Sequence, residues 1–156
     1  MNVTVTDVIG SLFNPTDTVC FRVFDDKKGG IFKGAKLSCE CGKYKSIEET
    51  LKNHNAMDRG IFFVVNYGGH DDESITRINA QFVEMDDCGF EEQQKKIDAF
   101  PLAPSMVMKT QKSYHVYWFM DSTAKVDRFR MIQTQLVKHF SGDPTCVNES
   151  RVMRLP

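Results

Sequence analysis

The chain has 156 residues, a formal net charge of −1 and a hydrophobic content of 41%. These values are ordinary for a globular protein, and the length fits one domain large enough to bury a core. No apolar run approaches the roughly 18 residues that cross a bilayer, and the N-terminus lacks the basic and apolar segments of a secretion signal. The composition therefore argues against a membrane protein and predicts a cytoplasmic one, whereas the net charge neither indicates nor excludes a nucleic-acid partner.

The first half of the chain predicts helices at residues 5–13 and 46–55 and strands at residues 19–24, 31–32, 35–39 and 61–65. The first helix should end before Pro15, since the residue that precedes a proline is pushed out of the α region. Ser46 and Glu49 have the spacing of a capping box, which predicts where the second helix begins. Residues 61–65 are continuously apolar, which is typical of a central strand that is covered on both faces.

The second half predicts helices at residues 91–100 and 126–140 and strands at residues 78–86, 105–110 and 114–120, with a last short strand near the C-terminus. The apolar residues of the last helix recur every three or four positions, at Val126, Phe129, Ile132, Leu136, Val137 and Phe140. That period indicates an amphipathic helix, and Gly142 just beyond it is a common helix end. This order of elements predicts an α+β protein with a mixed sheet and helices packed on it.

The five cysteines are odd in number and irregularly spaced, at Cys20, Cys39, Cys41, Cys88 and Cys146. That pattern argues against a secreted disulfide framework and predicts reduced thiols. Cys39 and Cys41 are two residues apart and could supply two thiolates to zinc. No second Cys/His pair follows at the spacing of a zinc finger or ribbon, so a zinc site has little support.

A polar loop with two glycines, residues 66–74, lies between the predicted strands at residues 61–65 and 78–86. Its composition is typical of a flexible surface turn. Two other interpretations stay open. The glycines could approach a phosphate of template or nucleotide, and His70, Asp71 and Asp72 could bind a metal.

Glu84 and Asp86 lie at the end of the strand predicted at residues 78–86. Side chains of a strand alternate between its two faces, so both carboxylates should point the same way. Like charges this close repel each other unless a cation lies between them, which suggests a bound divalent metal. The simpler alternative is a strand that emerges into solvent, because acidic residues often end edge strands.

The hairpin predicted at residues 105–120 brings Lys109, Lys112, Ser113 and His115 together at or near its turn. Ser113 and His115 share one face by the two-residue period, so a hydroxyl and an imidazole could reach one anionic ligand. The alternative for His115 is a packed core residue.

A third carboxylate, Asp143, precedes a proline after the last long helix, and Arg151 and Arg154 follow it. Asp before Pro is an ordinary turn signature. The functional alternative is that Asp143 completes a metal site with the earlier acidic pair. An arginine would then bind phosphate through its planar, always charged guanidinium group.

This order of motifs resembles the archaeo-eukaryotic primase superfamily, particularly the primases and primase-polymerases of plasmids, phages and integrated elements. The matching motifs are Glu84-Met85-Asp86, Ser113-Tyr114-His115, Asp143 and the Arg-Val-Met-Arg-Leu-Pro segment of residues 151–156. The resemblance spans about residues 61–156. One departure is Glu84, because many relatives carry Asp there.

The resemblance implies an α+β fold in which an RRM-like antiparallel catalytic core lies beside an N-terminal α/β portion. It also implies one primase-polymerase-like catalytic domain over residues 1–156, truncated at its C-terminus where relatives continue. The expected function is that of a DNA-dependent primase or polymerase in the replication of a plasmid, phage or mobile element. It would make primers from nucleoside triphosphates on single-stranded DNA, with no membrane partner and with a replicative helicase left open as a partner.

The resemblance also assigns roles to residues. Two Mg²⁺ or Mn²⁺ ions would be bound by Glu84, Asp86 and Asp143 and would serve nucleotidyl transfer, with His115 as the fourth catalytic residue. The nucleotide would be bound by Lys112, Ser113, His115, Arg151 and Arg154, of which Arg154 is the preferred arginine. Preference for ribo- or deoxynucleotides, the template sequence and the oligomeric state stay open.

Two other functions remain possible at this stage. The same carboxylates could direct water rather than a 3′-hydroxyl at a phosphate, which would make the protein a metal-dependent nuclease. The chain could also be a non-catalytic, nucleic-acid-binding replication accessory. Only the primase or polymerase would incorporate a labelled nucleoside triphosphate.

Overall fold

The computed structural model describes residues 3–156. Their elements follow in the order α1 (Val5–Leu12), β1 (Val19–Asp25), β2 (Lys36–Gly42), α2 (Tyr44–Ala56), β3 (Arg59–Val64), a short 3₁₀ helix (Asp72–Ser74), β4 (Ala80–Glu84), α3 (Phe90–Ala99), β5 (Met106–Lys109), β6 (Tyr114–Phe119), α4 (Val126–Phe140) and β7 (Val152–Arg154). No helix in this range is long and apolar enough to span a bilayer.

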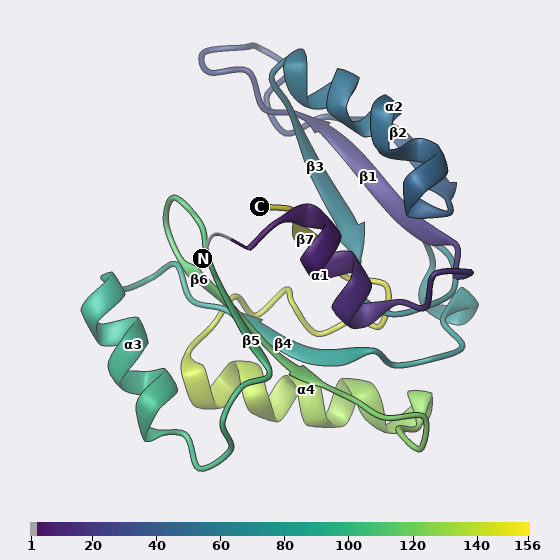
Figure 1. Cartoon of the computed structure of the whole chain (residues 1–156). Coiled ribbons are helices and arrows are strands. Elements are labelled where there is room, and N and C mark those ends of the chain that lie inside the picture. Colours follow the sequence, from purple (N-terminus) through teal and green to yellow (C-terminus); the bar gives the residue numbers. More distant parts are fainter. Residues whose placement is uncertain (1–2) are drawn as a thin grey trace.

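The strands form two sheets, as Figure 1 shows. The first sheet has the order β2-β1-β3-β7 and the second has the order β4-β6-β5, and the neighbouring strands of each are antiparallel. Strand β7 pairs with β3, where Phe63 is opposite Met153, so the last residues of the described chain return to the first sheet. The predicted α+β class with antiparallel sheets is confirmed.

Helix α1 lies between the two sheets (Figure 1). Helix α2 packs on the first sheet, whereas α3 and α4 lie beside the second. One apolar core joins α1 to both sheets and includes Val8, Ile9, Phe21, Phe63, Phe82, Tyr117 and Phe129. Full burial of each such aromatic side chain stabilises the fold by about 1.5–3 kcal/mol. A smaller core under α3 and α4 contains Val83, Ile97, Val116, Trp118 and Phe140.

Helix α4 has the bounds that its apolar period predicts, but its buried face is slightly rotated. The buried residues are Phe129, Gln133, Val137 and Phe140, whereas Ile132 is 40% exposed. Ser141 ends the helix in the left-handed conformation, with a φ of 52°. The helix therefore ends in a sharp turn that directs the following residues back towards β4.

Two predicted elements of the first half are wrong. Residues 31–32 form a turn rather than a strand, and Ile31 and Phe32 are exposed. Gly29 and Gly34 have φ angles of 75° and 84°, which non-glycine residues rarely adopt, and they allow this tight connection. Helix α2 begins at Tyr44, and the Ser46 hydroxyl donates to the backbone oxygen of Lys43, so the predicted capping box does not form.

The predicted reduced state of all cysteines is also wrong, because Cys20 and Cys41 form a disulfide. These residues are direct partners in the β1–β2 register, with Cα atoms 4.3 Å apart. This spacing is typical of a non-hydrogen-bonded pair on antiparallel strands, where side chains approach closely. The linear spacing of the cysteines does not indicate the register of the hairpin. Among the described residues, Cys39, Cys88 and Cys146 are free thiols.

The loop of residues 66–74 is anchored, contrary to the flexible turn that its composition suggests. The Asp72 carboxylate accepts hydrogen bonds from the backbone and side chain of Ser150 and from Asn148, at 2.7–3.0 Å. It also forms an ion pair with Arg130 of α4, at 2.8 Å. Partial burial alone would raise the pKa of Asp72, but the hydrogen bonds from Asn148 and Ser150 and the charge of Arg130 lower it to about 2.

Candidate active site

Glu84 lies where β4 leaves the main core. Ala80 and Phe82 share its face of the strand and are fully buried, whereas Glu84 is only partly buried. The same face of the sheet therefore changes from apolar to acidic over two residues. Asp86 is exposed and lies beyond the end of β4, so the strand predicted at residues 78–86 is two residues too long at each end.

Two residues of the neighbouring strand hold the Glu84 carboxylate. Glu84 is directly opposite His115 in the β4–β6 register, and the two side chains approach to 3.3 Å between Oε1 and Nε2. The Ser113 hydroxyl donates to the same Oε1 at 3.2 Å. The bond to His115 is the main cause that lowers the pKa of Glu84; partial burial opposes it, and the bond from Ser113 adds to it. Glu84 is therefore held as a fixed carboxylate.

Ser113 and His115 share a face, as the two-residue period predicts, but they point at Glu84 from within the protein. His115 is 2% exposed and Ser113 is fully buried. The Nδ1 atom of His115 is buried and has no hydrogen-bond partner among the described residues. In this arrangement the imidazole orients a carboxylate and does not present a free edge to solvent.

Asp143 is brought to Glu84 by the turn after α4. Its backbone N–H donates to the backbone oxygen of Glu84 at 3.1 Å. A Cβ atom on Gly142 would lie 2.7 Å from that same oxygen, so only glycine allows the approach. The charge of Asp143 tends to raise the pKa of Glu84, which places the two carboxylates in one electrostatic environment. Two of the three predicted carboxylates thus come together from segments far apart in the chain.

The turn also fixes the Asp143 side chain. The backbone N–H and the hydroxyl of Thr145 both donate to its carboxylate at 2.8 Å. Partial burial would raise the pKa of Asp143, but these bonds and the nearby charge of Arg151 hold it below its ordinary value. Beside it, burial raises the pKa of the Cys146 thiol to about 12. Asp143 is therefore ionised, and Cys146 is not a nucleophile.

The three predicted metal ligands do not form a tight cluster by themselves. Among the described residues, one group of three or more His, Cys, Asp or Glu side chains has all its ligand atoms within 4.8 Å, and it consists of Cys20, Cys41 and His70. Glu84 and Asp143 are linked through the backbone, and Asp86 is exposed two residues after Glu84. Their ligand atoms therefore do not form a close group in this structure.

Comparison with known proteins identifies the architecture. No protein-family model and no curated protein matches this sequence. The structure is similar to the archaeo-eukaryotic primase domain of the cyanophage S-2L primase-polymerase, with a TM-score of 0.78, 28% identity, and coverage of 94% of this chain and 77% of that chain. The chain has the fold of an archaeo-eukaryotic primase core.

Two structures of the primase RepB′ resemble this archaeo-eukaryotic primase core in fold. One has a TM-score of 0.64 at 15% identity and is matched over 97% of this chain and 49% of its own. The other is the RepB′ catalytic domain in complex with initiator DNA, with the same TM-score of 0.64 and 15% identity, matched over 98% of this chain and 76% of its own. At this identity the likeness concerns the fold.

The remaining predicted site residues of the primase core lie in different environments. Lys112 is exposed at the β5–β6 turn, directly before Ser113. Arg151 lies close enough to Asp143 for its charge to lower the pKa of that carboxyl, and its Nε atom is buried with no partner among residues 3–156. Arg154 instead stacks on the ring of Phe62 at 4.6 Å and donates to the Asp26 carboxylate at 3.0 Å. The two arginines are thus separated, and Arg151 is the one beside the acidic site.

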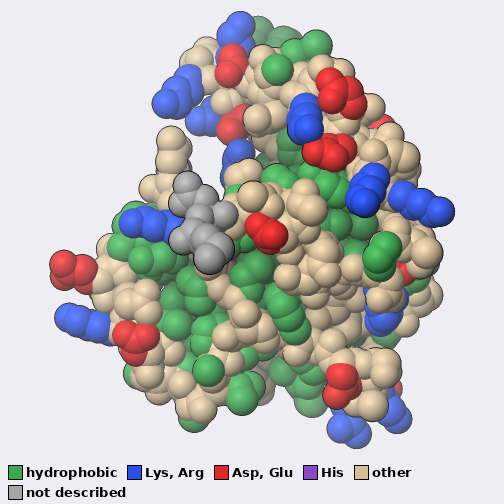
Figure 2. All heavy atoms as spheres, viewed as in Figure 1, with side chains coloured by type: hydrophobic (Ala, Val, Ile, Leu, Met, Phe, Trp, Pro, Cys, Tyr) green, Lys and Arg blue, Asp and Glu red, His purple; other side chains and the backbone are tan. Residues whose placement is uncertain are grey.

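The space-filling view shows an open notch between the upper lobe, which contains the first sheet, and the tip of the β5–β6 hairpin (Figure 2). Ser113, His115 and Glu84 lie at this end of the second sheet. A pocket of about 250 Å³, lined by Ile78, Gln81, Met120, Thr123, Ala124, Lys125, Arg128 and Ile132, lies at the opposite end of the same sheet. The acidic site is therefore separate from that pocket.

Two buried amides that sequence reasoning missed position this site. The Gln133 amide accepts from the backbone N–H of Phe82 at 3.2 Å and donates to the backbone oxygens of Phe82 and Cys146 at 2.6 and 2.8 Å. Gln93 of α3 accepts from the backbone N–H of Tyr114 at 2.7 Å and donates to the backbone oxygen of Cys88. Gln133 is a polar residue on the otherwise apolar face of α4, four residues after Phe129. This break in the apolar pattern could have indicated a buried amide with a structural role. Gln93 carries no such signal.

Proposed function

We propose that this protein is a DNA-dependent primase or primase-polymerase that joins nucleotides on single-stranded DNA in a metal-dependent reaction, in the replication of a plasmid, phage or mobile element. The observation that carries the proposal is the convergence of Glu84 and Asp143. Glu84 is fixed by Ser113 and His115, and the Asp143 backbone is bonded to the Glu84 backbone at 3.1 Å. The likeness to the cyanophage primase-polymerase domain supports the same function.

The donor set fits a hard divalent cation. Glu84, Asp86 and Asp143 offer carboxylate oxygens, which Mg²⁺ and Mn²⁺ prefer. Mg²⁺ usually keeps several water ligands and takes others from substrate phosphates, so it does not need a complete set of protein ligands. The pKa of Glu84 is lowered mainly by the bond to His115, and the nearby charge of Asp143 opposes this; a bound cation would remove that repulsion. When bound, the ions would lower the charge on the reacting oxygens of the phosphate.

In the proposed reaction, the 3′-hydroxyl of a growing strand forms a bond to the α-phosphorus of a nucleoside triphosphate. The bond between the α-phosphorus and the bridging oxygen breaks, pyrophosphate leaves, and the hydroxyl proton passes to solvent water. The protein contributes positioning and charge, which dominate phosphoryl and nucleotidyl transfer. Glu84 and Asp143 act as fixed carboxylates, because the bonds from His115, Ser113 and Thr145 limit their movement.

We assign supporting roles to the residues around the carboxylates. Ser113 and His115 are positioning residues that act through Glu84, since both point at its Oε1 atom. Arg151 is the proposed phosphate-binding arginine, because its charge reaches Asp143 and its Nε atom has no partner among the described residues. Lys112 is exposed at the adjacent turn and adds a flexible positive charge.

The template would lie along the open notch of Figure 2. The RepB′ catalytic domain has been crystallised with initiator DNA, and its fold is like that of this chain at a TM-score of 0.64. This likeness supports DNA as the polymer that the protein binds.

The direct test is synthesis of labelled product from nucleoside triphosphates on single-stranded DNA with Mn²⁺. We expect Asp143→Asn to reduce the rate on the order of 10²–10³-fold, since it removes a charge that would face the reacting phosphate. The matched control is Asp121→Asn. Asp121 accepts from the backbone N–H and hydroxyl of Thr123 at 2.8 and 2.5 Å, which copies the turn of Asp143 and Thr145, but it lies at the other end of β6.

Equal activity of both variants and the wild type would contradict the metal assignment. Shortening of the DNA without incorporation of label would show a nuclease instead. Binding of DNA with neither reaction, and with no affinity for nucleotide or Mn²⁺, would show a non-catalytic accessory.

A further inference from the structure

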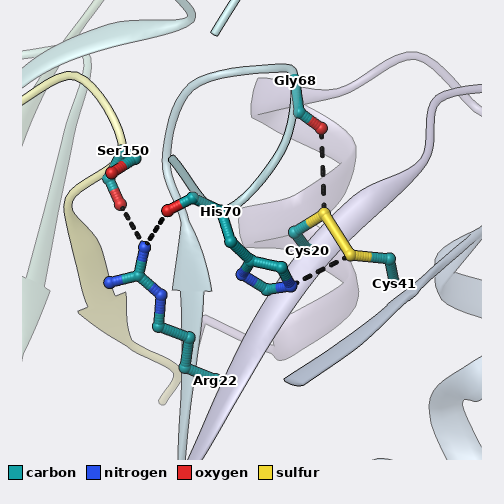
Figure 3. Close-up of a disulfide and its surroundings, with 6 residues drawn as sticks. All are labelled: Cys20, Arg22, Cys41, Gly68, His70 and Ser150. Carbon is teal, nitrogen blue, oxygen red and sulfur yellow. Dashed lines mark hydrogen bonds between the residues drawn. A yellow bond between two sulfur atoms is a disulfide. The ribbon is translucent and has the colours of Figure 1, made fainter. Parts of the chain in front are cut away.

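Three side chains that commonly bind transition metals meet on the first sheet, away from the acidic site. Cys20 lies on β1, Cys41 on β2 and His70 in the loop between β3 and β4. Their ligand atoms all lie within 4.8 Å of one another. Figure 3 shows the His70 ring directed at the sulfur pair.

The backbone around these side chains fixes His70 in this position. Its Nε2 atom lies 3.1 Å from the Cys41 sulfur. Arg22 donates from Nη2 to the backbone oxygens of His70 and Ser150, at 2.5 and 3.1 Å (Figure 3). Gly68 has a φ of 152°, and a Cβ atom there would lie 2.1 Å from the backbone oxygen of Ser74, so only glycine fits this turn of the loop. His70 is thus delivered to the cysteines by a constrained loop.

The polar contacts of the His70 ring also suit a metal ligand. The Nδ1 atom is buried and has no hydrogen-bond partner among the described residues. Among the described residues, the contact of Nε2 with the Cys41 sulfur is the polar interaction of the ring.

We propose that Cys20, Cys41 and His70 form a Zn²⁺ site when the protein is reduced. Two thiolates and one imidazole are a soft donor set that selects Zn²⁺ over Mg²⁺. The fourth ligand is water, since Cys41 is exposed to solvent. This site is distinct from the carboxylate site in its ligands, its metal and its sheet.

Disulfide and metal exclude each other at this site. A dithiol reductant supplies two electrons and two protons, which break the sulfur–sulfur bond, leave two thiols and convert the dithiol to its own disulfide. Zn²⁺ then replaces one proton on each thiol. Tetrahedral bonds of about 2.3 Å to sulfur and about 2.0–2.1 Å to nitrogen place the sulfurs about 3.8 Å apart and each sulfur about 3.6 Å from nitrogen. Rotation of the exposed Cys41 side chain can open this space.

The disulfide joins β1 to β2, whereas a metal at this site would join three segments of the chain. It would tie the loop of residues 66–74 to β1 and β2. The same loop carries Asp72, which holds Ser150 next to Arg151 through bonds of 2.7 and 3.0 Å. Zn²⁺ at this site would brace the segment that carries Arg151, the arginine beside the acidic site.

The test is a Co²⁺ titration of the whole chain, reduced with a dithiol and then freed of it without oxygen. Co²⁺ occupies Zn²⁺ sites and gives visible absorption bands that are characteristic of tetrahedral thiolate ligation. We expect one Co²⁺ per chain, displaced by one equivalent of Zn²⁺, and no such bands in the oxidised protein. The acidic site does not give these bands, because its donors are carboxylates.

Matched variants identify the ligands. Cys41→Ser should abolish the bands, and it is preferred to the buried Cys20 because its side chain is exposed. His70→Asn should weaken Co²⁺ binding at least tenfold. Cys39→Ser is the control, because Cys39 lies on the same strand and is also exposed but does not belong to the group. Circular dichroism of each variant checks that it is folded.

Two results would overturn the proposal. The first is a folded, reduced wild type without tetrahedral bands at one equivalent of Co²⁺. The second is a variant pattern in which Cys39→Ser loses the bands as Cys41→Ser does, or in which His70→Asn binds as tightly as the wild type. Neither result depends on the enzymatic activity proposed for the acidic site.

Discussion

The two sheets of this molecule have different interiors. On its covered face, the first sheet buries apolar residues such as Phe21, Val23 and Phe63 against α1 and α2. The second sheet also has an apolar core, but its strands are held by two buried amides, Gln93 and Gln133, and it carries the Glu84 cluster. Apolar packing tolerates small shifts, whereas buried hydrogen bonds fix positions and cost stability when one partner is lost. Buried hydrogen bonds therefore fix the strands of the second sheet, which carries the candidate site.

The largest expected effect is on product synthesis, in a variant of the second sheet that changes charge but not packing. Glu84→Gln keeps the shape of the side chain but removes the charge that a cation would face. We expect product synthesis to fall on the order of 10³-fold, equivalent to about 4 kcal/mol, with little change in the melting temperature. Glu92→Gln on α3, an exposed carboxylate, is the control and should stay active. Full activity of Glu84→Gln would refute the role of the acidic site.

The next effect concerns the amide that binds α4 to β4. Gln133→Leu leaves the backbone groups of Phe82 and Cys146 buried and unpaired, so we expect a loss of about 2–4 kcal/mol in the free energy of unfolding. Gln135→Leu, on the exposed side of the same helix, should change it by less than about 0.5 kcal/mol. Urea unfolding measures both. An unchanged midpoint for Gln133→Leu would mean that the second sheet relies on apolar packing as the first one does.

A smaller effect tests the junction between the two sheets. Asp72 has a pKa of about 2, below its ordinary value of 3.8, so it stabilises the fold above pH 3.8 and loses this effect as the pH falls towards 2. With a discount for solvent screening, we expect Asp72→Asn to cost about 1–2 kcal/mol at neutral pH. The difference from wild type should shrink below pH 3.8. Asp71→Asn is the exposed control, and an equal loss in both variants would contradict the assignment.

The smallest effect tests how Glu84 is positioned. Ser113→Ala removes one of the two side-chain bonds to the carboxylate and leaves the one from His115. We expect product synthesis to fall by about threefold to tenfold, in line with the net worth of about 1 kcal/mol for one such bond. The loss should lie in kcat rather than in KM for the nucleotide. A rise in KM alone would show that Ser113 contacts the nucleotide directly.

Sequence reasoning predicted the elements of the second sheet well. The bounds of α4 and the shared face of Ser113 and His115 follow from periods of 3.6 and 2, which are local properties of the chain. From the residues alone, the convergence of Glu84 with Asp143 was one of two alternatives, and the family motifs favoured it. Its physical cause is the Gly142 turn, which allows a backbone contact across some sixty residues of chain.

The features that were missed depend on register and on long-range contacts. The pairing of Cys20 with Cys41 depends on which residues of β1 and β2 are opposite each other. The anchored state of residues 66–74 depends on Ser150, which lies 78 residues after Asp72. The composition of this loop predicts an exposed turn, because no neighbouring residue indicates that Asp72 binds Ser150.

The central claim is that Glu84, Asp86 and Asp143 together hold the catalytic cations, and binding of Mn²⁺ in the presence of a non-hydrolysable nucleoside triphosphate tests it most directly. Electron paramagnetic resonance of free Mn²⁺ would compare wild type with Asp86→Asn, Asp143→Asn and the control Asp121→Asn. The account predicts at least tenfold weaker binding for the first two variants and an unchanged affinity for the third. Wild-type affinity in both Asp86→Asn and Asp143→Asn would contradict it.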